Sequence, residues 1–115
     1  MMVQTENEVR RVSTAVAKNP LSNELKVAAE IYRCELLGQK VWFGKLVELL
    51  DGVSNPNKKI SKNTISAAID TLFDWGIIKA EYGATETGRA GRLLMISNEA
   101  KSTITDLYEK YWKDL

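Results

Sequence analysis

Histidine is absent from this chain of 115 residues, and cysteine occurs only once, at Cys34. These scarcities exclude disulfide scaffolds, most zinc sites and any mechanism that needs a histidine as general base. The carboxylates are scattered without a convergent pair, and no glycine-rich phosphate loop follows a strand-like segment. We therefore expect no enzymatic activity, no cofactor and no metal site. Cys34 is interpreted as structural, with redox sensing as the alternative.

Long apolar runs and a large excess of charge are also lacking. No apolar run approaches the roughly 18 residues that a membrane helix needs, and residues 1–6 lack the pattern of a secretory signal. We expect a cytoplasmic protein without a membrane partner. The formal net charge of +1 is too small for a basic field that would hold nucleic acid nonspecifically. Any contact with nucleic acid must therefore come from local patches.

The length and composition predict one folded domain. The chain is long enough for a hydrophobic core without metals or disulfides, and 44% of its residues are hydrophobic and 27% charged, as in ordinary globular proteins. We predict a single domain over residues 1–115, with an N-terminal helical extension over 1–18, a core over 19–97 and a C-terminal helix over 98–115. In the extension, Val9, Val12 and Val16 have the spacing of a short amphipathic helix.

Capping residues and apolar spacing predict two helices in the first half of the core. Asn19 and Pro20 suit the N-cap and the first helical position, and this helix is expected to end near Gly38. A short strand or bridge at 39–41 and a helix over 42–50 should follow. Residues 51–60 contain Asp-Gly and Asn-Pro pairs, which predict a loop.

A further helix is predicted over residues 61–75, with Ser61 as its N-cap and Gly76 at its end. Its apolar residues have the spacing of an amphipathic helix, and its other face carries small and polar side chains that allow close approach to another surface. The apolar stripe consists of Ile65, Ala68, Ile69, Leu72 and Phe73, and the polar face of Asn63, Ser66, Ala67, Asp70 and Asp74.

The remaining core residues predict a β-hairpin. Residues 77–82 and 93–96 suit two strands, and the glycine-rich residues between them predict a flexible loop, the wing, over 83–92. Ser97 is expected to cap the last helix. The predicted fold class is therefore mainly α with a small β-hairpin, that is α+β.

Four segments carry a family resemblance: ISKNTIS at 60–66, DxLxxxGII at 70–78, GRAGR at 88–92 and LxISNEA at 94–100. With the order helix, helix, loop, helix, hairpin, helix, they resemble the winged helix-turn-helix fold and are similar to the MarR and PadR families of transcription regulators. The resemblance covers residues 21 to about 100. It implies sequence-specific binding to double-stranded DNA by a dimeric transcriptional regulator. Two features differ from the family's pattern: the loop over 51–60 is longer than usual, and Ala67 stands where many relatives carry arginine.

Physical arguments also favour DNA contact. The start of the helix over 61–75 offers free backbone N–H groups and a positive dipole end to a phosphate. Asn63 suits a bidentate contact to adenine, and Arg89 suits a narrow minor groove or a phosphate. The alternatives are that the lysines form an ordinary solvated surface and that Asn63 and Thr64 only decorate the first helical turn. The expected DNA-binding residues are Lys58, Lys59, Ser61, Lys62, Asn63, Thr64, Ser66, Ala67, Arg89 and Arg92.

The C-terminal helix predicts a second copy as partner, because its aromatic stripe exceeds what so small a body can readily cover. Packed against the N-terminal helices of the partner, it would place two reading helices on successive half-sites of DNA. The alternative function is a winged-helix protein-interaction or assembly module, favoured by the near-neutral charge. A small-molecule effector near Trp42, Trp75 or Trp112 is left open. The expected dimerisation residues are Tyr108, Tyr111, Trp112 and Leu115.

Overall fold

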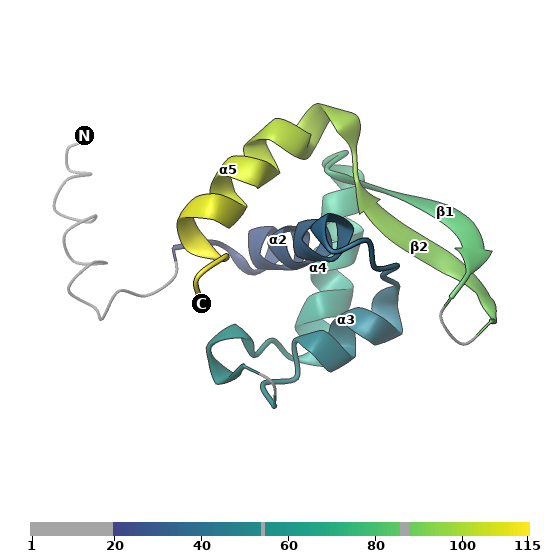
Figure 1. Cartoon of the computed structure of the whole chain (residues 1–115), viewed down its shortest axis with the longest axis horizontal. Coiled ribbons are helices and arrows are strands. Elements are labelled where there is room, and N and C mark those ends of the chain that lie inside the picture. The colour runs from purple at the N-terminus through teal and green to yellow at the C-terminus, as the bar shows by residue number, and fades with distance from the viewer. Residues whose placement is uncertain (1–19, 54, 86–87) are drawn as a thin grey trace, which may run out of the picture.

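Helices and one antiparallel hairpin make up the computed structural model, which describes residues 20–53, 55–85 and 88–115. The predicted helix over 6–18 and Asn19 lie outside the described residues. The predicted α+β class is confirmed, and the order of elements agrees with a winged helix (Figure 1). The elements are α2 (Asn23–Leu36), α3 (Phe43–Leu49), η1 (Pro56–Lys58), α4 (Lys62–Asp74), β1 (Ile78–Ala84), β2 (Ala90–Ile96), η2 (Asn98–Ala100) and α5 (Lys101–Tyr111).

Helix α2 begins later than predicted. Ser22 is its N-cap and accepts a hydrogen bond from the backbone N–H of Leu25 (3.3 Å), whereas Pro20 is exposed and precedes the helix. The predicted start at Pro20 is wrong, because the cap is supplied by Ser22, which lies directly before the helical run. The predicted end is confirmed, since Gly38 takes φ +69° and closes a Schellman turn through its N–H bond to Glu35 O (3.0 Å).

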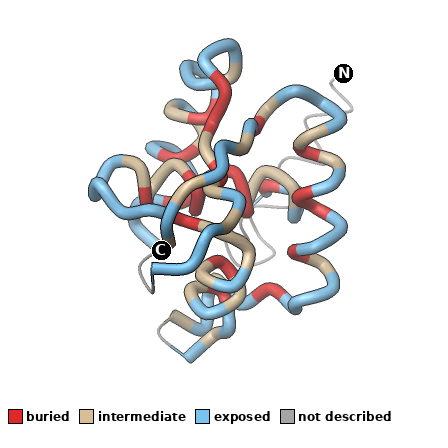
Figure 2. The backbone as a smooth tube through the Cα atoms, turned by 90° about the vertical axis from the view of Figure 1, so that its right-hand side faces the viewer, coloured by how far each residue is buried: buried red, intermediate tan, exposed pale blue. Residues whose placement is uncertain are grey.

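The core forms where α2 crosses α4, with α3, the base of the hairpin and α5 packed around that crossing (Figure 1). In Figure 2, the buried residues lie along the inner faces of the helices, and the exposed residues lie outside. The predicted apolar stripe of α4 faces this core, and Cys34 is buried within it. Fully or nearly fully buried residues include Val27, Ala28, Ile31, Cys34, Leu46, Ile65, Ala68, Leu72, Ile96 and Ile104.

The hairpin is longer than the sequence predicts. Strands β1 and β2 pair over seven residues each, from Ile78 opposite Ile96 to Ala84 opposite Ala90. The predicted loop over 83–92 is therefore too long, because small residues at its ends continue the ladder. The expected strand or bridge at 39–41 is reduced to a backbone bond from Leu94 N–H to Val41 O (2.8 Å).

Ser97 was predicted to cap the last helix, but its side chain makes no capping hydrogen bond and instead joins two elements. Its hydroxyl donates to Gly76 O (2.7 Å), just after α4, and its backbone N–H donates to Ile77 O (2.8 Å). Gly76, with φ +73°, ends α4 in a Schellman turn completed by the Ile77 N–H bond to Leu72 O (3.0 Å). The end of α4 and the start of the C-terminal segment are thereby held together.

The C-terminal helix covers its own core with two of the aromatic residues assigned to dimerisation. Trp112 is 0% exposed and Tyr108 is 8% exposed, and Tyr108 makes an edge-to-face contact with Tyr32 at 5.3 Å between ring centroids. The expectation that these two side chains exceed what the body can cover is wrong, because α2 provides a complementary face. Tyr111 and Leu115 remain exposed.

A buried carboxylate anchors the end of this helix. Glu30, on α2, is 1% exposed and accepts hydrogen bonds from Trp112 Nε1 (2.9 Å) and Arg33 Nη2 (2.6 Å). The hydrogen bond to Glu30 raises the pKa of Arg33. The ammonium of Lys58 lies 4.8 Å from the centre of the Trp112 ring, a cation–π geometry, and burial lowers the pKa of Lys58. These contacts tie α2, the end of α5 and the segment before α4 together.

Trp112→Phe should lower the free energy of unfolding by about 1–3 kcal/mol, because the buried carboxylate of Glu30 loses a donor. Urea unfolding followed by circular dichroism measures the change. The matched control is Trp75→Phe, whose parent side chain is 58% exposed and whose effect should stay within about 0.5 kcal/mol. Equal effects of the two substitutions would contradict an anchoring role for Trp112.

Candidate nucleic-acid interface

The start of α4 is capped as predicted. The Ser61 hydroxyl accepts from Thr64 N–H (3.3 Å) and donates to Thr64 Oγ1 (2.8 Å). Both hydroxyls are therefore engaged within the cap, which gives Ser61 and Thr64 a structural role. Helix geometry leaves the backbone N–H groups of Lys62 and Asn63 without an intrahelical acceptor, so they remain available to an anion.

The three lysines expected at this helix start do not form one cluster. Lys59 and Lys62 are exposed, whereas Lys58 is half-buried with its ammonium over the Trp112 ring. Lys58 is therefore directed toward the C-terminal helix and stands apart from Lys59 and Lys62. The sequence could not reveal this, because Trp112 lies far along the chain.

The outer face of α4 carries the predicted small and polar side chains. Asn63, Ser66, Ala67, Asp70 and Asp74 are all exposed, while the apolar stripe is packed inside. This face is narrow and free of bulky groups. A helix with side chains is about 10–12 Å across, which matches a major groove about 12 Å wide.

The hairpin places Arg89 and Arg92 beside α4, Arg89 from the turn and Arg92 from strand β2. Arg89 is exposed beside the turn, where its carbonyl accepts from Thr85 N–H (2.8 Å) and Gly88 takes φ +88°. Arg92 lies within β2, not in the loop as was predicted, and its guanidinium carbon is 5.0 Å from the centre of the Phe73 ring. Stacking on an α4 side chain fixes Arg92 beside that helix.

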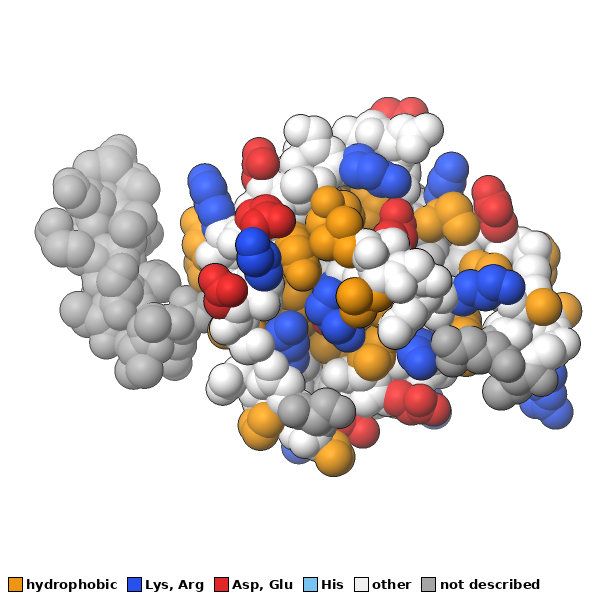
Figure 3. All heavy atoms as spheres, in the orientation of Figure 1, with side chains coloured by type: hydrophobic (Ala, Val, Ile, Leu, Met, Phe, Trp, Pro, Cys, Tyr) orange, Lys and Arg blue, Asp and Glu red, His pale blue; other side chains and the backbone are white. Residues whose placement is uncertain are grey.

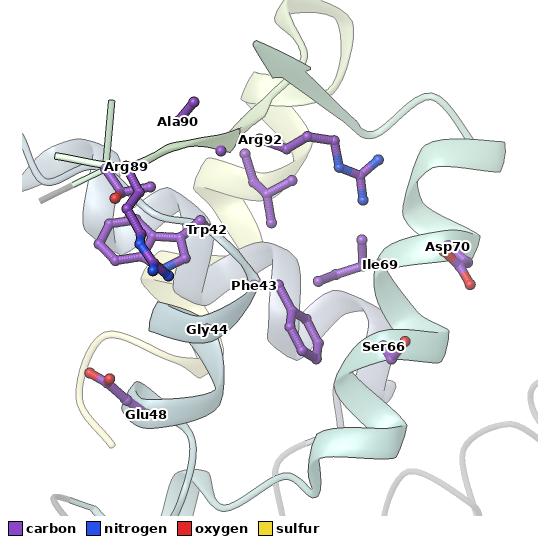
Figure 4. A pocket seen from close by; sticks show the side chains of 13 residues that line it. Trp42, Phe43, Gly44, Glu48, Ser66, Ile69, Asp70, Arg89, Ala90 and Arg92 are labelled. Atoms are coloured by element: carbon purple, nitrogen blue, oxygen red, sulfur yellow. The ribbon is translucent and has the colours of Figure 1, made fainter. Parts of the chain in front are cut away.

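A groove of about 640 Å³ separates α4 from the hairpin. Figure 4 shows the start of α3, one face of α4 and the strand β2 around it. Its apolar floor includes Phe43, Ile69 and Leu94, and its rim carries charges of both signs. The polar and charged residues that line it are Glu48, Ser66, Asp70, Thr85, Arg89 and Arg92.

Three side chains at this surface were not predicted. Tyr82 is 82% exposed and lies opposite Arg92 in the hairpin register, so both project from one face. Lys40 adds a cation near the turn, because its Nζ donates to Ala84 O (3.1 Å). Glu48 contributes an acid to the groove. The alternation of Ile78, Ala80 and Tyr82 is the sequence signal that could have indicated the first of these.

The surface mixes charges and does not form one basic patch. In Figure 3, basic and acidic side chains are interspersed across the visible face, with apolar side chains between them. Across residues 20–53, 55–85 and 88–115, no group of three metal-ligating side chains is present. No helix in that same part of the chain is long and apolar enough to cross a membrane.

No protein-family model and no curated protein sequence matches the chain. Two solved structures resemble it over most of its length. The circadian clock associated protein Pex from anabaena superposes with a TM-score of 0.61 at 22% identity, covering 94% of this chain and 91% of that one. Pex from Synechococcus sp. superposes with a TM-score of 0.57 at 22% identity, covering 94% of both chains. This likeness shows a shared fold and does not confirm the predicted MarR or PadR resemblance.

Ser61→Ala should destabilise the protein by about 1 kcal/mol, because the N–H of Thr64 loses its cap. Thermal unfolding followed by circular dichroism measures this. Ser66→Ala is the matched control, since Ser66 is exposed within α4 and alanine favours a helix interior. A loss of the same size in both variants would show that the Ser61 cap is not the cause.

Proposed function

We propose that this chain is a DNA-binding transcription regulator that places α4 in the major groove of duplex DNA. The observation that carries the proposal is the shared groove: the outer face of α4 and the arginines of the hairpin line the same surface. The fold shared with the two Pex structures is compatible with this function.

Two sets of contacts would hold the duplex. Lys62 and the free N–H groups at the start of α4 would bind a backbone phosphate, assisted by the positive end of the helix dipole. Arg89, beside the turn, would bind the minor groove or a neighbouring phosphate, with Lys59 close to the helix start. Asn63, Ser66 and Ala67 would approach base edges, where Asn63 can pair with adenine.

Lys62→Ala and Arg89→Ala should each weaken duplex binding. Each should also make the negative slope of log K against log salt shallower by about one, because one phosphate contact is lost. Fluorescence anisotropy with a labelled duplex, across a salt series, gives both quantities. Lys58→Ala is the matched control because the Lys58 ammonium lies over Trp112, and its salt slope should equal that of the unmodified protein. Absence of duplex binding even at low salt would contradict the proposed function.

The alternative is a protein-interaction module, and the exposure of Trp75 and Tyr82 is the observation that favours it. Large aromatic side chains at a surface commonly mark protein contacts. The two functions differ in salt dependence. Binding to DNA would weaken steeply with salt, whereas an aromatic contact with a protein would change little.

A homodimer is the second part of the proposal. Tyr111 and Leu115 are exposed at the C-terminal end and could pack against another copy, while Tyr108 and Trp112 are already buried. A two-fold dimer would set two copies of α4 on successive half-sites. Its affinity for a palindromic duplex would exceed that of a single subunit because both halves bind together.

Tyr111→Asp should convert the dimer into a monomer, since it places a charge in the proposed apolar contact. Light scattering at tens of micromolar should give the mass of two chains for the unmodified protein and of one chain for the variant. Tyr82→Asp, at an exposed aromatic position on the hairpin, is the matched control and should stay dimeric. A monomeric unmodified protein would contradict the dimer but not the binding of DNA.

A further inference from the structure

We propose that Asp70 selects cytosine at one position of the DNA half-site, an inference that rests on the proposed DNA binding. Asp70 is exposed on the outer face of α4, one turn beyond Ser66 and two turns beyond Asn63. It also lines the groove between α4 and the hairpin. Figure 4 shows Ser66 and Asp70 on successive turns, with Arg92 extending from β2 toward the same helix.

The position of Asp70 makes it more than a solvated surface charge. Along α4 it lies between Lys62 at the helix start and Phe73, on which Arg92 stacks, so a duplex on this surface would cover it. Within the described part of the chain, the carboxylate of Asp70 makes no ion pair or hydrogen bond with another side chain. Its charge is therefore not neutralised by the protein, and phosphates nearby would repel it.

A carboxylate is accommodated in a major groove when a base amino group donates to it. Cytosine presents only the N4 amino donor in that groove, whereas adenine places the N7 acceptor beside its N6 amino group. Guanine and thymine present acceptor oxygens, O6 and O4, which would repel Asp70. Cytosine is thus the one base whose major-groove edge is a donor without an adjacent acceptor.

Helix geometry fixes where this cytosine should lie. Asn63 and Asp70 are seven residues apart and share one face, because seven residues complete nearly two turns. With a rise of 1.5 Å per residue, their Cα atoms are separated by about 10.5 Å along the axis, or about three base pairs. We expect a half-site with an adenine opposite Asn63 and a cytosine about three base pairs away.

The experiment selects bound duplexes from a random pool with the unmodified protein and then exchanges each base pair of the selected half-site in turn. For the unmodified protein, replacing the cytosine should weaken binding about 5- to 150-fold, the range for loss of one specific base contact. For Asp70→Ala, the same replacement should change affinity less than about three-fold, because the variant lacks the carboxylate that distinguishes cytosine from the other bases. Alanine is the best helix former, so this variant should fold.

Asp74→Ala is the matched control. Asp74 is exposed one turn further along the same face and does not line the groove. Removing either acid should raise affinity for unrelated duplexes to a similar extent, because each removes one negative charge. Only Asp70→Ala should also lose the preference for cytosine. A duplex in which hydrogen replaces the 4-amino group of that cytosine should bind the unmodified protein weakly and Asp70→Ala normally.

Two results would overturn the inference, and they are distinguishable. If duplexes are selected but Asp70→Ala keeps the base preferences of the unmodified protein, Asp70 does not read a base and the proposed function stands. If no duplex is selected even at low salt, the proposed function fails and the inference fails with it.

Discussion

The buried carboxylate of Glu30 constrains the packing of the helices. A charge removed from water is tolerated in a protein only when donors surround it, and here the indole of Trp112 and the guanidinium of Arg33 supply them. Because Trp112 belongs to the end of the chain, satisfying Glu30 fixes the C-terminal segment against α2. The ammonium of Lys58 then lies over the ring of this restrained indole. The segment leading into α4 is positioned by the same cluster.

Helix α4 has two surfaces with different requirements. Its inner stripe packs against α2 and determines the orientation of the helix, while its outer face consists of small or polar residues. Both ends of the helix are defined by local signals. Ser61 caps its start, and Gly76, in the left-handed region, ends it. The Ser97 hydroxyl donates to the carbonyl of Gly76. Because Ser97 lies between β2 and α5, this bond fixes the end of α4 relative to the base of the hairpin and to α5. The outer face of α4 is therefore held in position by contacts at both ends of the helix.

Local chemistry allowed much of the fold to be predicted from the sequence. Ser61, Gly76 and the apolar spacing between them act within a few residues, so the prediction of α4 is confirmed. The wing was predicted too long because Gly83, Ala84, Ala90 and Gly91 have weak strand preferences and pair only through the hairpin ladder.

The errors at the candidate site have a common cause. Lys58 appeared to belong with Lys59 and Lys62 because they are close in sequence, but its contact is Trp112. Trp112 appeared to be surplus apolar surface because its partner, Glu30, is separated from it by 82 residues. Pairings at such distances depend on the tertiary fold, and no local pattern in a single sequence specifies them. The outer face of α4, which depends only on helical periodicity, was predicted correctly.

The distribution of charge limits how DNA could be bound by this surface. The chain has a net charge of +1, and the outer face of α4 passes from Lys62 at its start to Asp70 and Asp74 further along. Counterion release at a few cations gives modest affinity, so nonspecific binding would be weak at physiological salt. Acids within the contact surface lower that nonspecific affinity further, while a carboxylate that finds a base amino group loses little in specific binding. If α4 binds DNA as proposed, the near-neutral charge would favour discrimination between sequences over overall affinity, and pairing two half-sites through a dimer would restore the affinity without adding positive charge.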